Sequence, residues 1–146
     1  MRTIIQRVSN AKVRVDEQEI GAIHQGLLLL VGIHQKDTEE QLYWMCEKIL
    51  KVRIFADEEG KMNKSVMDIN GEILVVPQFT LYGDVKKGTR PSYIEAARPE
   101  KAKPMYEAMI HYLKNNSQLV VKKGKFGALM DVELVNKGPV TLILEK

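Results

Sequence analysis

A continuous apolar run at residues 27–31 (LLLLV) limits what this chain can fold into more than any other part of its sequence. The run is far shorter than the roughly 18 apolar residues that a membrane span needs, so it has the length of a strand. A half-buried strand alternates apolar and polar side chains, whereas this one is apolar on both faces. We therefore expect a central strand in a sheet that is covered on both sides, and no membrane association.

Strands are also expected at both ends of the chain. Residues 2–15 alternate between apolar and polar side chains, which predicts two paired, half-buried strands with a break near Ser9 and Asn10. The alternation returns at residues 130–134 and again at residues 140–144. These segments make the chain rich in strands.

The clearest helix signal begins at Thr38. Thr38 and Gln41 have the spacing of a capping box, in which each side chain satisfies a free backbone N–H of the other residue. Cys46 lies on the apolar face of this helix, so we interpret it as a core residue and not as a nucleophile. That face consists of apolar side chains at spacings of three and four: Leu42, Met45, Cys46, Ile49 and Leu50.

Prolines mark the second helical region. Pro99 is expected to be the first residue of a helix, where its missing N–H would have no partner in any case. Pro104 should kink that helix or postpone its start. A shorter helix is expected just before it, from Pro91 or Ser92 through Ala97.

Composition and length place these elements in one domain. The 146 residues are 45% hydrophobic and 28% charged, close to the average of globular proteins, and no linker or internal repeat divides them. The N-terminal residues lack the apolar stretch of a signal peptide, and the one cysteine fits a reducing cytoplasm. We predict a single α/β domain over residues 1–146, with a strand-rich, mixed, partly barrel-like sheet and two main helices packed on one face.

The usual signatures of catalytic sites are absent from the sequence. His24, His34 and His111 fall on separate segments without the spacing of metal ligands, and Cys46 has no partner. The serine-hydrolase motif GxSxG, the phosphate-binding P-loop and the dinucleotide-binding GxGxxG are missing. We therefore expect neither a metal nor a cofactor.

Residues 75–81 (VVPQFTL) resist a purely structural interpretation. Pro77 cannot donate a ladder hydrogen bond, so the strand either lies at a sheet edge or ends there. Gln78 and Thr80 interrupt the apolar run just after this proline. Two interpretations stay open: an edge strand with one solvated face, or a strand end that presents backbone N–H groups, an amide and a hydroxyl to a ligand.

Two further features also allow more than one interpretation. The Gly138–Pro139 step between two strands is either an ordinary turn or part of a site. The net charge of +3 permits a nucleic-acid partner without requiring one. Basic side chains on two segments either face phosphate groups or lie solvated on loops: Lys86, Lys87, Arg90, Lys122, Lys123 and Lys125.

Several segments, taken in order, resemble the D-aminoacyl-tRNA deacylase family over nearly the whole chain. The resemblance implies an enzyme that hydrolyses the ester between a D-amino acid and the 3′ end of tRNA. It also implies a homodimer, in the cytoplasm, whose partner is the aminoacylated 3′ end of tRNA. The segments are residues 6–8 (QRV), 52–57 (VRIFAD), 61–63 (KMN), 78–83 (QFTLYG), 87–92 (KGTRPS), 124–130 (GKFGALM) and 136–141 (NKGPVT).

The same resemblance assigns roles to individual residues. Gln78, Phe79 and Thr80 would line the pocket for the scissile ester, and backbone N–H groups there would polarise its carbonyl. Gly138 and Pro139 would form a cis pair that each subunit inserts into its partner's site. The main-chain carbonyls of this pair would then exclude L-amino acids by steric clash.

The resemblance extends to two supporting residues and to a second substrate. Arg7 would hold the orientation of the Gly-Pro pair, and Met130 would pack at the wall of the site near it. Glycine has no side chain to clash with the filter, so glycyl-tRNA is also an expected substrate.

One position departs from the family pattern, because Pro77 stands where the family usually has Ser. A related branch that tends to carry Pro there acts on tRNA mischarged with an L-amino acid. Arg7 and Phe79 match the D-specific pattern, and we favour D-specificity. A non-catalytic RNA-binding module and a dimeric small-ligand binding protein are the alternatives from other functional classes.

Overall fold

The apolar strand lies inside a six-stranded sheet, as its sequence predicts. The computed structural model describes residues 1–146. The strands of the sheet are β1 (Arg2–Val15), β2 (Gln18–Ile23), β3 (Gly26–Gly32), β6 (Glu72–Pro77), β7 (Val121–Lys123) and β8 (Asp131–Glu145). Their order is β2–β1–β3–β6–β7, with β8 paired to β1. β3 is antiparallel to β1 and parallel to β6, so the sheet is mixed.

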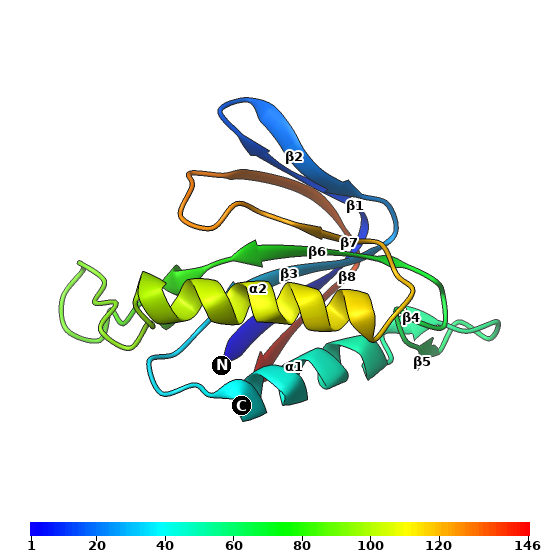
Figure 1. The fold of residues 1–146 in the computed structure, drawn as a ribbon. Coiled ribbons are helices and arrows are strands. Elements are labelled where there is room, and N and C mark those ends of the chain that lie inside the picture. Colours follow the sequence, from blue (N-terminus) through cyan, green and yellow to red (C-terminus); the bar gives the residue numbers. More distant parts are fainter.

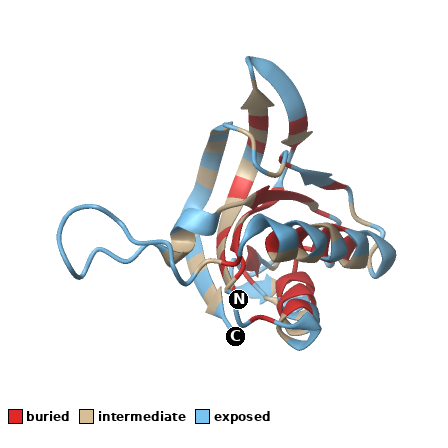
Figure 2. Cartoon of the chain, turned by 60° about the vertical axis from the view of Figure 1, so that its left-hand side comes forward, coloured by how far each residue is buried: buried red, intermediate tan, exposed pale blue.

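Two helices cover one face of this sheet (Figure 1). They are α1 (Glu39–Lys51) and α2 (Pro99–Asn115). A cluster of 23 buried residues fills the space between the helices and the sheet, including Leu27 and Leu29 of β3. Figure 2 shows these buried residues gathered on the strands and helix surfaces that face one another. The helical layer on one face confirms that part of the predicted architecture.

The opposite face of the sheet has a smaller core of its own. Leu28 and Leu74 point to this side and pack in a cluster of seven buried residues beneath the β1–β2 hairpin. The hairpin curls so far that a Cβ on Gly21 would lie 3.3 Å from the Lys123 carbonyl oxygen of β7. The two ends of the sheet therefore approach each other, and the predicted barrel-like, mixed α/β fold is confirmed.

The N-terminal strand differs from the prediction in one respect. We expected two strands broken near Ser9 and Asn10, but β1 is one continuous strand of 14 residues. Its pairing with β8 shifts register between Gln6 and Val8 and again between Val8 and Asn10. At such irregularities the alternation of apolar and polar side chains shifts by one residue. In the sequence this shift has the same appearance as a break between two strands.

The capping box of α1 is confirmed. Thr38 is the N-cap, its N–H donates to Gln41 Oε1 at 2.8 Å, and its hydroxyl accepts from the Glu40 N–H at 3.3 Å. The five predicted apolar residues are the buried residues of this helix. After α1 come a short hairpin, β4 (Phe55–Ala56) and β5 (Met62–Lys64), and later a 3-10 helix, η1 (Phe79–Tyr82).

The second helix begins where expected, but the short helix before it does not form. α2 starts at Pro99 and contains Pro104 without a delayed start. Residues 91–97 are non-helical instead, and the Ala97 N–H donates to the Ile33 carbonyl at 2.8 Å. Long-range backbone pairing therefore replaces the local helix, and proline at position 99 keeps Arg98 extended (φ −67°, ψ 156°). Neither α2 nor any other helix is long and apolar enough to cross a membrane.

We expect Cys46 to be unreactive in the folded protein. Its side chain is fully buried, and burial raises the pKa of its thiol to about 12, so the reactive thiolate is nearly absent at neutral pH. Labelling with a disulfide reagent near pH 8 should be at least about 100-fold slower in the folded protein than in guanidinium. Rapid labelling of the folded protein would contradict this.

The same thiol should make stability depend on pH at the alkaline end. The unfolded thiol ionises near its ordinary pKa of 9.0, while the folded thiol stays protonated until about 12. Ionisation above pH 9 therefore favours the unfolded chain, and stability is lost as the pH rises from about 9 to 12. Unfolding curves of Cys46→Ala and the unsubstituted protein across this range measure the effect.

Candidate active site

A cavity of about 580 Å³ opens at the carboxyl ends of β3 and β6, beside the start of α2. Three parts of the chain form its wall: the strand ends, the first turn of α2 with the segment before it, and the loop that follows β7. Most of the lining is apolar. The lining includes Pro77, Gln78, Phe79, Tyr93, Arg98 and Met130.

The turn at the end of β6 leaves two backbone N–H groups free. Pro77 is the last residue of β6, and the next N–H, that of Gln78, donates to the Val31 carbonyl at 2.8 Å. The chain then enters η1, whose first residues have no acceptor within a 3-10 helix. The N–H groups of Phe79 and Thr80 have no other partner in the chain. Two adjacent donors thus remain available on the turn whose residues Gln78 and Phe79 line the cavity.

Of the two interpretations of residues 75–81, the edge strand is wrong. β6 lies between β3 and β7, and its four central residues are buried. The strand ends at Pro77, as the other interpretation requires. Gln78 then takes a non-strand conformation (φ −143°, ψ 76°), which directs residues 78–82 out of the sheet.

The side chains on this turn are arranged around the two free donors. The Gln78 amide donates to the Thr80 hydroxyl. No histidine, lysine or carboxylate contacts that hydroxyl, so it lacks the base that would turn it into a nucleophile. Phe79 is 58% exposed and packs edge-on against Tyr93, with 5.1 Å between the ring centroids. These two rings form one rim of the cavity.

A buried tyrosine supports the cavity from below. The Tyr106 hydroxyl lies 2.9 Å from the Val75 carbonyl oxygen of β6 and 3.1 Å from that of Gly124, just after β7, so its one proton is shared between the two segments. Burial raises the pKa of this phenol well above its ordinary value. Gly124 packs closely here, since a Cβ on it would lie 2.8 Å from the Met130 sulfur. Tyr106 therefore holds together the two strand ends from which the cavity wall is built.

The other predicted site residues, Arg7 on β1 and Gly138 and Pro139 on β8, lie together where these two strands pair, and none of them lines the cavity. Asn136 pairs with Val8 and Thr141 pairs with Gln6, so residues 137–140 bulge out opposite the single residue Arg7. The Gly138–Pro139 peptide bond in this bulge is cis, and both residues are exposed.

Arg7 braces the bulge from β1. Its Nε donates to the Lys137 carbonyl at 2.9 Å and its Nη1 to the Ile54 carbonyl at 2.5 Å. Gly138 has φ +129°, and a Cβ on it would collide with the Arg7 guanidinium. Glycine is therefore required at this position for both conformation and space.

One chain thus brings together only part of the predicted site. Gln78, Phe79 and Met130 line the cavity, and Thr80 contacts Gln78. Arg7 of β1 and Gly138 and Pro139 of β8 form a separate cluster, and none of them lines the cavity. Sequence reasoning missed the cavity residues Tyr93, Arg98 and Tyr106, because no motif marks a residue that reaches a pocket only through folding.

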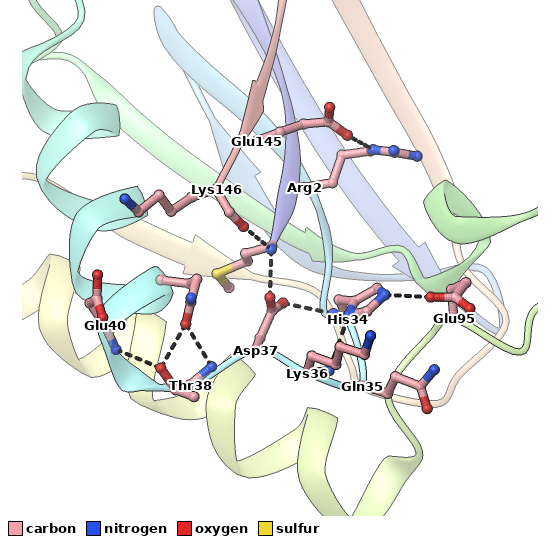
Figure 3. A network of polar contacts seen from close by, with 12 residues as sticks. Arg2, His34, Gln35, Lys36, Asp37, Thr38, Glu40, Glu95, Glu145 and Lys146 are labelled. Atoms are coloured by element: carbon pink, nitrogen blue, oxygen red, sulfur yellow. Dashed lines mark hydrogen bonds and ion pairs between the residues drawn. The ribbon is translucent and has the colours of Figure 1, made fainter.

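Each of the three histidines takes part in its own hydrogen bond, as their scattered positions suggest. His34 Nε2 lies 2.6 Å from Glu95 Oε2, and Figure 3 shows this pair at the edge of a polar network around Asp37. His111 contacts Asn115 at 2.7 Å on α2, and the backbone N–H of His24 donates to Glu72. No group of three or more His, Cys, Asp or Glu side chains is placed to hold a metal ion.

The fold has close counterparts among solved structures. A structure titled "c-Myc DNA Unwinding Element Binding Protein" superposes with a TM-score of 0.95 and 43% identity, covering 100% of this chain and 99% of its own. A structure titled as an analysis of a probable eukaryotic D-amino acid tRNA deacylase superposes with a TM-score of 0.82, covering 98% and 97%. At 17% identity the second likeness shows a shared fold alone.

Sequence comparison defines the relationship more closely. A protein of Thermotoga petrophila named D-aminoacyl-tRNA deacylase is 55% identical over 99% of this chain and 97% of its own length. A protein of the same name from Thermosipho africanus is 54% identical over the same shares. The family model described as D-Tyr-tRNA(Tyr) deacylase matches residues 4–145. This chain, whose sequence motifs already resembled such enzymes, therefore belongs to the D-Tyr-tRNA(Tyr) deacylase family.

Proposed function

We propose that this protein hydrolyses the ester between a D-amino acid and the 3′-terminal ribose of tRNA, releasing tRNA and the D-amino acid. The observation that carries the proposal is the pair of free N–H groups, those of Phe79 and Thr80, on the turn whose residues Gln78 and Phe79 line a mostly apolar cavity. Family membership supplies the substrate class. Aminoacyl-tRNA is made in the cytoplasm, and the activity is expected there.

The chemistry needs no nucleophile from the protein. Water adds to the ester carbonyl carbon, and the carbonyl oxygen becomes an oxyanion that accepts from the Phe79 and Thr80 N–H groups. The intermediate then breaks its bond to the ribose oxygen, which leaves as a hydroxyl after taking a proton from the added water. Each donor of this kind contributes about 3–4 kcal/mol to the transition state. Gln78 holds the Thr80 side chain aside through its amide.

We further propose that a second subunit supplies the part that selects chirality. In a two-fold dimer each subunit offers the same surface, so the 137–140 bulge of one chain can enter the cavity of the other. The carbonyls of Gly138 and Pro139 would then face the substrate's α-amino group and leave no space for an L side chain. Glycine would escape this exclusion, so glycyl-tRNA is also a proposed substrate.

The exposed surface of β8 supports such a dimer. β8 pairs with β1 on one edge only, and its other edge has no strand partner. Val135 and Ile143 expose 53% and 65% of their apolar side chains on this strand. Leu129, at the rim of the cavity, is 94% exposed. Covering these side chains would remove apolar surface from water in the dimer.

The reaction is tested with tRNA charged with D-tyrosine, L-tyrosine or glycine. We expect the D-tyrosyl ester to be lost at least about 100-fold faster than the L-tyrosyl ester, because a clash with fixed carbonyls costs more than a lost methylene contact. Glycyl-tRNA should also be hydrolysed. Equal rates for both enantiomers, or faster loss of the L-ester, would replace this proposal by the branch that acts on L-esters. Binding of tRNA without hydrolysis would favour an RNA-binding module.

Mixed dimers test whether the bulge acts across subunits. Phe79→Pro removes a proposed donor, and Gly138→Ala displaces the bulge through its contact with Arg7. Each variant alone should be impaired. In a heterodimer, the subunit carrying Gly138→Ala has an intact turn and receives an intact bulge, so mixing should restore about a quarter of wild-type activity.

Action within one chain predicts a different outcome for the same mixture. Every site would then take its turn and its bulge from the same subunit, so each site would contain one defective part and no activity would return. A fully active monomer in sizing experiments would also refute the dimer.

A further inference from the structure

We propose that the loop at residues 83–93 is a phosphate-binding surface that docks the acceptor stem of the tRNA whose 3′ end occupies the cavity. This inference rests on the proposed function, and names the part of the chain that binds the rest of the substrate. It concerns the three cations Lys86, Lys87 and Arg90, which the proposed chemistry does not use.

The loop is built as a closed projection next to the cavity. Backbone hydrogen bonds join Asp84 and Ser92 in both directions, at 2.8 and 2.9 Å, and close its neck. Tyr93, on the cavity rim, directly follows the neck. Gly83 directly precedes the neck and packs on the Tyr93 ring, since a Cβ on Gly83 would lie 3.0 Å from that ring. Figure 1 shows the loop extending from the same end of the molecule at which α2 begins. Anything that leaves the cavity at this rim passes the loop.

The charges on the loop are unpaired. Residues 85–94 contain Lys86, Lys87 and Arg90 and no acidic residue, and all of them are exposed. None of these three cations makes an ion pair, whereas Lys51, Lys61 and Lys123 each pair with a glutamate. Asp84 is engaged by the Lys86 backbone N–H at 2.8 Å. The loop therefore presents three cations without an ion-pair partner to solvent, against the single carboxylate of Asp84 at its neck.

Two more unpaired cations border the cavity. Arg98 lines it just before α2. Lys125 directly precedes the lining residue Phe126 and follows Gly124, which packs against Pro77. When the terminal aminoacyl-adenosine occupies the cavity, the rest of the tRNA continues outward as nucleotides that each carry a phosphate. Cations on both sides of the opening match that charge, and an arginine can bind a phosphate through two parallel hydrogen bonds. The loop cations lie beyond the neck closed by Asp84 and Ser92, and we assign them to the phosphates of the following stem.

The test compares two substrates and two matched variants. Lys86→Ala/Lys87→Ala/Arg90→Ala removes the loop charges. Lys51→Ala/Lys61→Ala/Lys114→Ala removes three charges from the last turn of α1, the β4–β5 turn and the last turn of α2. These segments lie at the end of the molecule opposite the loop (Figure 1). The substrates are full-length D-tyrosyl-tRNA and D-tyrosyl-adenosine, which has no phosphate. Arg98 is left unchanged because it lines the cavity.

We expect the loop variant alone to lose activity on tRNA. Its kcat/KM for D-tyrosyl-tRNA should fall more than about tenfold near 0.1 M salt, and the slope of log(kcat/KM) against log[salt] should become shallower by about 2 to 3. On D-tyrosyl-adenosine both variants should match the wild type within about twofold, because no phosphate contact is lost there. Equal losses of the two variants on tRNA, an unchanged salt slope, or an equal loss on both substrates would overturn the proposal.

A binding measurement distinguishes failure of the docking surface from failure of the proposed function. If the wild type hydrolyses neither ester, binding of uncharged tRNA is measured for the same three proteins by fluorescence anisotropy. Weaker, less salt-dependent binding by the loop variant alone would still support the docking surface. Equal dissociation constants for the two variants would refute it.

Discussion

Replacing Phe79 by proline is expected to lower kcat for D-tyrosyl-tRNA about 100- to 1,000-fold, the usual cost of removing one oxyanion donor. Proline has no backbone N–H, and position 79 is the first residue of η1, where proline fits a helix. Gln78 before it is not helical, so the new ring avoids the clash that a helical neighbour would cause. The loss should therefore fall on the reaction and not on the fold, as measured by single-turnover kinetics alongside urea unfolding.

Two substitutions separate the backbone group from the side chains. Phe79→Ala removes the ring and its contact with Tyr93 but keeps the N–H, so it should retain much more activity than Phe79→Pro. Thr80→Val removes the hydroxyl, which has no base beside it, and should also leave substantial activity. Equal defects in Phe79→Pro and Phe79→Ala would show that the N–H is not a donor to the substrate. A trapped aminoacyl ester on Thr80 would show instead that its hydroxyl is the nucleophile.

Replacing Asp37 by alanine is expected to destabilise the fold by about 3–5 kcal/mol, because it leaves a buried positive charge without its partner. Asp37 is 5% exposed, and its carboxylate accepts from the Met1 ammonium at 2.6 Å and from the His34 N–H at 2.7 Å. Figure 3 shows how this carboxylate joins the start of β1 to the segment before α1. The Met1 ammonium also donates to the Lys146 carbonyl at 2.6 Å, so the contact joins the start of β1 to the end of β8, which lie side by side in this antiparallel pair.

Glu145 provides the matched surface control in the same region. It forms an ion pair with Arg2, but its side chain is 54% exposed. Glu145→Ala should therefore change the free energy of unfolding by less than about 1 kcal/mol, since solvent screens the pair and competes for both groups. Both values follow from urea unfolding at neutral pH. Similar small effects of the two substitutions would mean that the Asp37 pair does not stabilise the fold.

The helices show how far local patterns can predict structure. The capping box of Thr38 and Gln41 involves residues three apart, and the buried face of α1 follows from its spacing, so both could be predicted without knowledge of the rest of the chain. The expected helix through residues 91–97 failed because its backbone pairs with Ile33, more than fifty residues earlier. No local pattern reports such a partner.

The candidate site divides in the same way. Pro77 alone determined that a strand must end or lie at an edge there, because its missing N–H is a property of the residue. Only the pairing of β6 with β3 and β7 decided that this strand lies inside the sheet and stops at Pro77. Because it stops there, the N–H groups of Phe79 and Thr80 remain free. Motif resemblance identified both Gln78 and Gly138, whereas their separation within one chain is visible only in the folded structure. Side-chain type and spacing are carried by the sequence itself, but which distant segments share a cavity depends on packing across the whole sheet.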